Sequence, residues 1–172
     1  MEQSSKTLTF VVPAYNMETY LERCVESLLS ATDNSDIEVL IVDDGSSDST
    51  PELADMYERR WPGNVRAIHQ VNKGHGGAVN TGIANATGMY VKVVDADDWV
   101  DMPSIDTLMG TLRVQRVATD PVDMIVTNYV YDKVGKRVKH TVNFRHAMAA
   151  NTVLGWDDLG CFGVAEYILM HA

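Results

Sequence analysis

The sequence predicts an α/β protein in which a mostly parallel central sheet is flanked by helices. Short apolar runs typical of buried strands occur four times between residues 8 and 94, and segments with helical spacing of apolar residues lie between them. Strands that alternate with helices are joined by right-handed crossovers, which produce a parallel sheet covered on both faces. A third observation is that polar residues gather where each apolar run ends.

The first predicted strand is the run LTFVV at residues 8–12. It stops at Pro13, because proline has no N–H group for a sheet ladder. The following residues 20–29 carry apolar side chains, including Leu21 and Leu28, at spacings of three and four. This spacing predicts a helix that packs one face on the sheet.

The second predicted strand is residues 37–42, and a helix is expected to follow it. Ser49 and Glu52 have the spacing of a capping box, and Pro51 lies in the first turn. We therefore expect a helix that runs to about Arg60.

The third strand–helix pair and the fourth strand are predicted from the same kinds of sequence pattern. Residues 65–71 have the pattern of a strand, and residues 78–86 have that of a helix. Residues 89–94 are rich in β-branched side chains, which favour a strand. Residues 103–116 are expected to form a further helix.

Two elements are predicted after this helix. One is a strand over residues 123–127, and the other is a hairpin over 129–141 that turns near 133–136.

Composition limits the classes of protein that remain. The 172 residues are 45% hydrophobic and 22% charged, which is typical of one compact domain. The net charge of −10 opposes binding to nucleic acid or anionic lipid, because both require clustered cations. No 18 apolar residues run together, so no membrane span is predicted. Cys24 and Cys161 fit no zinc or disulfide pattern, which favours a reducing, cytoplasmic setting.

Polar side chains follow the ends of all four predicted strands. Ligands of parallel α/β sheets bind beyond these carboxyl ends, so the four segments are expected to line one edge of the sheet. The segments are Pro13–Asn16, Asp43–Gly45, Asn72–Gly77 and Asp95–Asp98.

Asp95 and Asp97 are the strongest candidates for a metal site. In an extended segment their side chains point to the same side, with their backbones about 7 Å apart. Carboxylate oxygens suit Mg²⁺ or Mn²⁺, and a cation would offset the repulsion among the acidic residues 95–98. The alternative is a solvated acidic turn that caps the following helix.

The polar residues at the ends of the other predicted strands also allow more than one interpretation. Of Asp43 and Asp44, one carboxylate is expected to accept bonds from the loop backbone and the other to be free for a ligand. Tyr15 is either a core aromatic or a stacking surface for a flat base. The glycines of residues 74–77 either let a ligand approach the backbone or form a turn, and Val79 stands where a dinucleotide fingerprint needs glycine.

Four motifs together resemble the nucleotide-sugar domain of family 2 glycosyltransferases. They are FVVPAYN at 10–16, LIVDDGSSDST at 40–50, NKGHGGAVNTGI at 72–83 and VVDADDWV at 93–100. The resemblance implies a GT-A fold, which is a Rossmann-like three-layer fold. It also implies transfer of a sugar with inversion, from a UDP-sugar donor to an acceptor hydroxyl of a glycan or a lipid-linked glycan.

The resemblance also implies roles for individual residues. Tyr15 and Asp44 would contact the uracil, and Mn²⁺ or Mg²⁺ would be held on the diphosphate by a DxD pair. The implied nucleotide-binding residues are Pro13, Tyr15, Asp43, Asp44, Asn72, Gly74 and Asp95. The implied metal ligands are Asp95 and Asp97, with Asp98 replacing or supporting one of them.

We expect a single GT-A domain over residues 1–172, with a nucleotide-sugar part at 7–110 and the start of an acceptor-side part at 111–172. The apolar run at 166–172 resembles the start of a strand. In the family the catalytic base follows this strand, so we expect an N-terminal fragment whose base lies beyond Ala172.

The family implies synthesis of cell-surface polysaccharide or glycolipid, with the full-length protein at the inner face of the membrane. One alternative is a non-catalytic module that binds a nucleotide sugar. Another is a nucleotidyltransferase, although the sequence lacks the glycine-rich basic loop that such enzymes carry near the N-terminus.

Overall fold

The computed structural model describes residues 6–132, 139–146, 148–155 and 158. The chain divides into two compact units, Met1–Thr119 and Asp120–Ala172. The first unit contains a four-stranded sheet and the second a two-stranded one. The expectation of one domain with a division near residue 110 stays a prediction.

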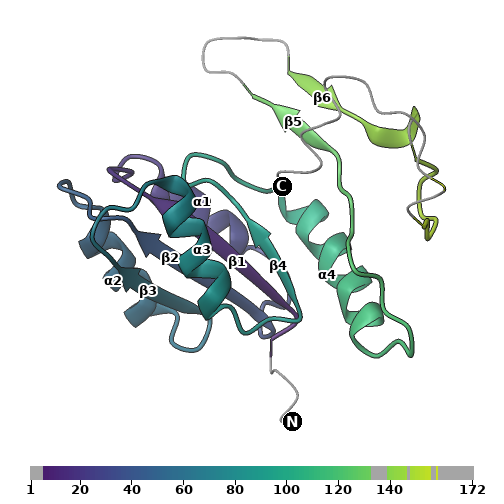
Figure 1. Cartoon of the computed structure of the whole chain (residues 1–172), viewed down its shortest axis with the longest axis horizontal. Coiled ribbons are helices and arrows are strands. Elements are labelled where there is room, and N and C mark those ends of the chain that lie inside the picture. Colours follow the sequence, from purple (N-terminus) through teal and green to yellow (C-terminus); the bar gives the residue numbers. More distant parts are fainter. Residues whose placement is uncertain (1–5, 133–138, 147, 156–157, 159–172) are drawn as a thin grey trace. The chain divides into compact units, whose positions relative to one another are not determined.

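The sheet of the first unit is fully parallel (Figure 1). Its strands are β1 (Leu8–Ala14), β2 (Ile37–Asp43), β3 (Val65–His69) and β4 (Tyr90–Val93), in the order β3-β2-β1-β4. Ala14 pairs with Asp43 and Asp43 with His69, so the carboxyl ends of three strands are level. The predicted α/β class and parallel sheet are confirmed.

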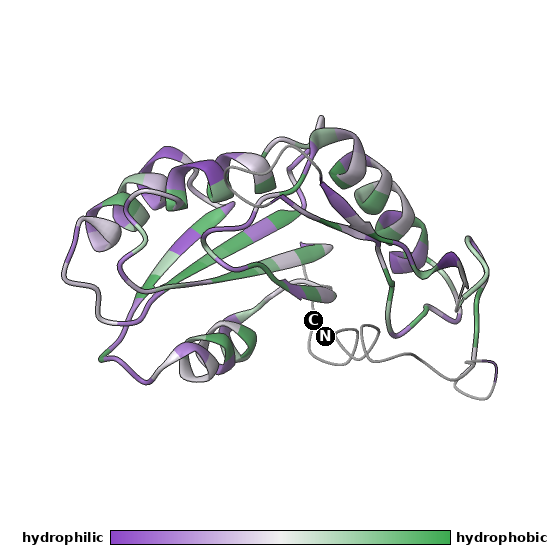
Figure 2. Ribbon diagram, turned by 90° about the horizontal axis from the view of Figure 1, so that it is seen from above, coloured by the Kyte–Doolittle hydropathy of each residue, from purple (hydrophilic) through white to green (hydrophobic). Residues whose placement is uncertain are grey.

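Helices cover both faces of this sheet. The helices of the first unit are α1 (Leu21–Leu28), α2 (Thr50–Arg60), α3 (His75–Asn85) and α4 (Met102–Arg116). Figures 1 and 2 show α3 on one face of the sheet and α1 and α2 on the other. Because both faces are covered, every residue of β1 and β2 is buried, and the strands are mostly hydrophobic (Figure 2).

The helix α3 lies close against the sheet. Val11, Val42 and Ala78 form a buried cluster between them. Gly82 faces β1, and a Cβ atom at this position would overlap Val11 Cγ1. A glycine is therefore required for the close approach that brings the start of α3 to the carboxyl edge of the sheet.

One predicted helix start differs from the structure, and the cap of another helix is made by other groups than predicted. The helix expected at 78–86 begins at His75, because Gly74 turns the chain with a φ of 76°. The helix α2 starts after Ser49 as its N-cap and ends at Arg60, as predicted, but the bonds of a capping box are replaced by contacts from outside the helix. Glu18 Oε2 accepts from Ser49 N at 3.0 Å, and Asp48 Oδ1 accepts from Thr50 N at 3.0 Å.

The second unit confirms the predicted hairpin. Strands β5 (Tyr129–Tyr131) and β6 (His140–Val142) pair antiparallel, and a 3-10 turn follows at Phe144–His146. The predicted turn near 133–136 and the run at 166–172 lie outside the described residues.

The strand predicted over residues 123–127 is wrong. These residues, all of them described, form no strand, and Met124 is 51% exposed. The segment does not pair with a neighbouring strand, and an apolar pattern without such a partner does not form a strand. Within the described part of the chain, no helix is both long and apolar enough to span a membrane.

Candidate functional site

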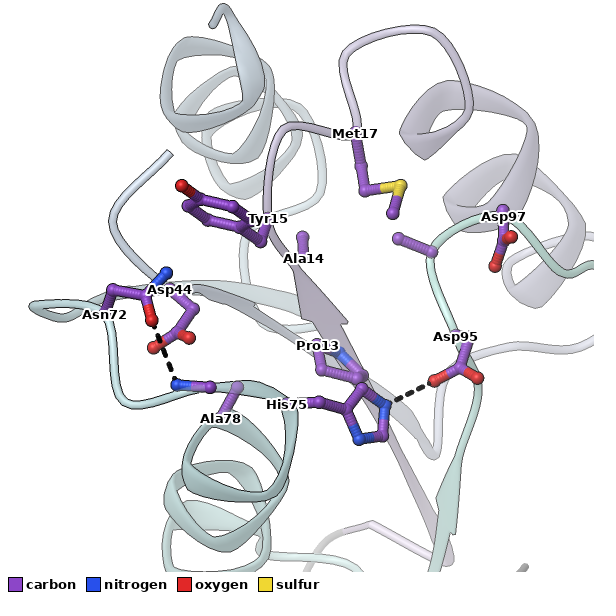
Figure 3. Close-up of a pocket in the computed structure, with 12 residues that line it drawn as sticks. Pro13, Ala14, Tyr15, Met17, Asp44, Asn72, His75, Ala78, Asp95 and Asp97 are labelled. Atoms are coloured by element: carbon purple, nitrogen blue, oxygen red, sulfur yellow. Dashed lines mark hydrogen bonds and ion pairs between the residues drawn. The ribbon is translucent and has the colours of Figure 1, made fainter. Parts of the chain in front are cut away.

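A cavity of about 490 Å³ opens at the carboxyl edge of the parallel sheet, beside the start of α3 (Figure 3). Segments at the ends of β1, β2, β3 and β4 all contribute to its wall, as predicted from the polar residues at the carboxyl ends of these strands. Its lining residues are Pro13, Ala14, Tyr15, Met17, Asp44, Asn72, Gly74, His75, Ala78, Asp95, Ala96 and Asp97.

Most of the residues singled out from the sequence line this cavity. They are Pro13, Tyr15, Asp44, Asn72, Gly74, Asp95 and Asp97. Asp43 and Asp98 lie outside the described lining. Of the other lining residues, Ala14, His75 and Ala96 belong to the predicted polar segments, whereas Met17 and Ala78 lie outside them.

Tyr15 presents an open aromatic surface to the cavity. Its side chain is 49% exposed, which excludes the alternative of a core aromatic. The loop that carries it is fixed to the loop after β2: Asn16 N donates to Ser46 Oγ at 2.9 Å, and Met17 N donates to Thr50 Oγ1 at 2.8 Å. A ring on a braced loop is suited to stacking on a planar base.

The Asp44 carboxylate is buried against the wall of the cavity and is 2% exposed. Its Oδ1 accepts from Gln70 Nε2 at 2.6 Å and from Lys73 N at 2.8 Å. Burial alone would raise the pKa of Asp44, but hydrogen bonds from Gln70 and from the backbone of Lys73 and Gly74 lower it below its ordinary value. The cavity therefore has an ionised acceptor at this point.

Asp43 is not among the residues that line the cavity, and its carboxylate contacts neighbouring groups of the protein. Its Oδ1 accepts from Ser46 N at 3.0 Å, and its Oδ2 lies 3.1 Å from His69 Nδ1. The other ring nitrogen of His69 is 3.1 Å from Asp55 Oδ1 on α2. The expected division between the two aspartates is thus only partial, because Asp44 also accepts a backbone bond.

The acidic segment after β4 forms the opposite wall. Asp95 and Asp97 line the cavity, and Asp95 Oδ1 is 2.7 Å from Nε2 of His75 at the start of α3 (Figure 3). His75, which lies in the predicted polar segment Asn72–Gly77, thus belongs to the wall. Asp98 N donates to Asp95 O at 2.8 Å, so the segment makes a tight turn.

This turn does not cap the helix that follows it. The cap of α4 is Asp101, whose Oδ2 accepts from Ser104 N at 3.1 Å. Burial, together with the charges of Asp97 and Asp95, raises the pKa of Asp98. A cation bound here would offset the repulsion among these neighbouring carboxylates.

The two lining carboxylates fit a divalent cation that takes its other ligands from a substrate. Among the described residues, no group of three or more His, Cys, Asp or Glu side chains could hold an ion alone. Mg²⁺ commonly binds one or two carboxylates and completes its shell with phosphate oxygens and water. Asp95 and Asp97 supply that number of carboxylates at the edge of the cavity.

Comparison with known proteins identifies the family. Residues 9–163 match the sequence profile of glycosyl transferase family 2. The chain belongs to this family. Glycosyltransferase GlyG of Streptococcus pneumoniae is 40% identical over 131 residues, which are 75% of this chain and 41% of GlyG.

Solved structures show that this glycosyltransferase family member has the GT-A fold. The crystal structure of S. aureus TarS 1-349 in complex with UDP matches 63% of this chain and 32% of that chain, with 26% identity and a TM-score of 0.57. The mannosyltransferase PcManGT from Pyrobaculum calidifontis, in complex with GDP-Man and Mn²⁺, matches 66% of this chain and 32% of its own, with 27% identity and a TM-score of 0.55. The chain thus spans well under half of the proteins it matches.

Proposed function

We propose that the protein transfers a sugar from a UDP-sugar to an acceptor hydroxyl, with inversion and with a divalent metal ion. The observation that carries this proposal is the lining of one cavity by an open tyrosine ring, an ionised buried aspartate and a pair of aspartates from the turn after β4. Membership of glycosyl transferase family 2 and the UDP complex of TarS support the same chemistry.

The base of the donor is assigned to the wall formed by Tyr15, Asp44 and Asn72. Tyr15 supplies a surface for stacking, and Asp44 accepts a hydrogen bond from an N–H group of the base. Both residues lie on loops that backbone hydrogen bonds hold in place, so little ordering is needed when the base binds.

The diphosphate is assigned to the space between the start of α3 and the acidic turn. The N-terminus of a helix attracts negative charge, and Gly74 and His75 at the start of α3 line the cavity. Asp95 and Asp97 would hold Mn²⁺ or Mg²⁺. When bound there, the ion stabilises negative charge on the departing nucleoside diphosphate as a Lewis acid.

The acceptor completes the proposal. Its hydroxyl attacks the anomeric carbon from the face opposite the diphosphate, and a carboxylate facing the acceptor takes the proton. The aspartates that line the cavity are committed to the donor, so none of them is assigned as this base. By family analogy, we assign the acceptor to a glycan or lipid-linked glycan made at the inner face of the membrane.

The test is calorimetric titration of the chain with UDP in the presence of Mn²⁺, with GDP as the competing nucleotide. We expect saturable UDP binding that is lost with chelator and weakened at least about tenfold by Asp97→Ala, because one of two metal ligands is removed. Asp120→Ala is the matched control, since Asp120 is exposed and lies outside the lining residues. Absence of UDP binding by a folded sample, or tighter binding of GDP, contradicts the proposal.

A further inference from the structure

We propose that Gln70 and Thr81 are positioning residues of the nucleotide site. They hold the Asp44 carboxylate as a hydrogen-bond acceptor and thereby favour uracil over cytosine in the donor. This inference rests on the proposed function, in which Asp44 receives the base.

Three elements are joined by one chain of hydrogen bonds. Thr81 Oγ1, on α3, donates to Gln70 Oε1 at 2.6 Å. Gln70 Nε2, beyond β3, donates to Asp44 Oδ1 at 2.6 Å. The backbone of Gln70 is also fixed, because its N–H donates to the carbonyl of Asp43 at 3.0 Å.

The Asp44 carboxylate, which only accepts, selects the end of the glutamine amide that faces it, and the hydroxyl of Thr81 holds the other end in place. An amide has a carbonyl oxygen that accepts and a nitrogen that donates, and either could point toward Asp44. With the oxygen toward the carboxylate, two acceptors would face each other. The donated bond from Thr81 holds the oxygen in place while Nε2 binds Asp44.

A carboxylate held in this way can only accept. Asp44 is 2% exposed, and the hydrogen bonds that it accepts from Gln70 Nε2 and from Lys73 N end on Oδ1. A protonated Asp44 would be able to donate a hydrogen bond. In a buried position the protonated form is favoured when hydrogen-bond donors to the carboxylate are lost, so the bonds from Gln70 and Lys73 keep Asp44 ionised. Gln70 therefore acts on the ligand through Asp44 and does not line the cavity itself.

The acceptor character of Asp44 has a consequence for base recognition. Uracil presents an N–H group at N3, whereas cytosine presents a bare ring nitrogen there, which would face the carboxylate without a proton between them. A site whose buried polar group is left unpaired by the wrong ligand discriminates strongly against it. Selectivity for UDP over CDP is thus the property that Gln70 and Thr81 are expected to control.

The test measures dissociation constants for UDP and CDP, with Mn²⁺ present, for the unaltered chain and for substituted chains. Gln70→Leu is expected to lower the ratio of the CDP constant to the UDP constant on the order of tenfold, since a bond to a charged group is lost. Thr81→Val is expected to lower it about threefold, because Gln70 Oε1 then loses its donor and the amide is held less firmly against Asp44. Thr81→Ser keeps the hydroxyl and should retain the original ratio.

Thr111→Val on α4 is the matched control, because the Thr111 hydroxyl donates only to the carbonyl of Thr107 in its own helix. It should leave the ratio unchanged. Thermal unfolding of each variant separates general destabilisation, which weakens both nucleotides alike, from a change in the ratio.

If the unaltered chain prefers UDP and neither Gln70→Leu nor Thr81→Val changes the ratio, the inference is wrong while the proposed function stands. If the unaltered folded chain binds neither nucleotide, both fail. A ratio that falls in Thr81→Val and is restored in Thr81→Ser supports the inference.

Discussion

Replacing Gly82 with alanine tests how closely α3 must approach the sheet. In an open helix this substitution stabilises by about 1 kcal/mol, because alanine has the higher helix propensity. At Gly82 the added Cβ would overlap Val11 Cγ1 and would lie 3.0 Å from Cγ2 and 3.1 Å from Cβ of the same valine. The two effects therefore oppose each other at this position.

The steric effect is expected to dominate. Val11 is fully buried in the centre of the sheet, and a β-branched side chain has little freedom to change its rotamer. Overpacking a core costs about 1–3 kcal/mol, and a clash with a stiff neighbour belongs near the upper limit. We therefore expect Gly82→Ala to lower the free energy of unfolding by about 2 kcal/mol after the propensity gain is subtracted.

Gly110 provides the matched control, because it also lies inside a helix and a Cβ atom there meets nothing within 4 Å. Urea denaturation followed by circular dichroism should show Gly110→Ala to be about 1 kcal/mol more stable and Gly82→Ala to be less stable than the unaltered chain. Adding Val11→Ala should remove the penalty of Gly82→Ala, which would appear as a coupling of about 2–3 kcal/mol. Equal stabilisation by Gly82→Ala and Gly110→Ala would refute the argument.

Three further substitutions test the electrostatics of the fold. Hydrogen bonding to Asp43 raises the pKa of His69. Its contribution to the free energy of unfolding is therefore complete below about pH 6.5 and is lost as the pH rises through the folded pKa. Denaturation of His69→Gln at a series of pH values should show a smaller fall in stability over that window. Burial opposes ionisation of Glu38, but hydrogen bonds lower its pKa. Its contribution to the free energy of unfolding is therefore complete above about pH 4.3 and is lost as the pH falls through the folded pKa. Glu38→Gln should be less stable at neutral pH and should lose less stability on acidification in the same series. Arg113→Lys should lower the unfolding free energy by about 1 kcal/mol in urea melts, because lysine cannot reproduce the two bonds to the Asp36 carboxylate, and no change would contradict this.

Local patterns predicted most of the first unit, because strands buried on both faces are written as continuous apolar runs. Residues 8–12 and 37–42 fall within β1 and β2 for this reason. The same logic failed at residues 123–127, where an apolar pattern is not buried in a ladder. A strand needs a partner, and a single segment of sequence does not contain that information.

The capping of α2 shows a second limit. Ser49 and Glu52 have the spacing of a capping box, yet Glu18 reaches Ser49 N from the loop after β1. Glu18 is 31 residues away in the chain. Local spacing predicts only the bonds that neighbours in sequence can make, and here a distant side chain competes successfully.

The sequence by itself determined the class of the fold, the edge of the sheet at which polar residues gather, and the motifs that resemble family 2 glycosyltransferases. Apolar periodicity and the geometry of parallel crossovers are sufficient for the first two. Only the tertiary structure decided that Asp44 lines the cavity while Asp43 turns to His69, and that Gln70 and Thr81 stand behind Asp44. Adjacent residues at a strand end point to opposite sides, and which side receives a partner depends on helices and loops far away in the chain.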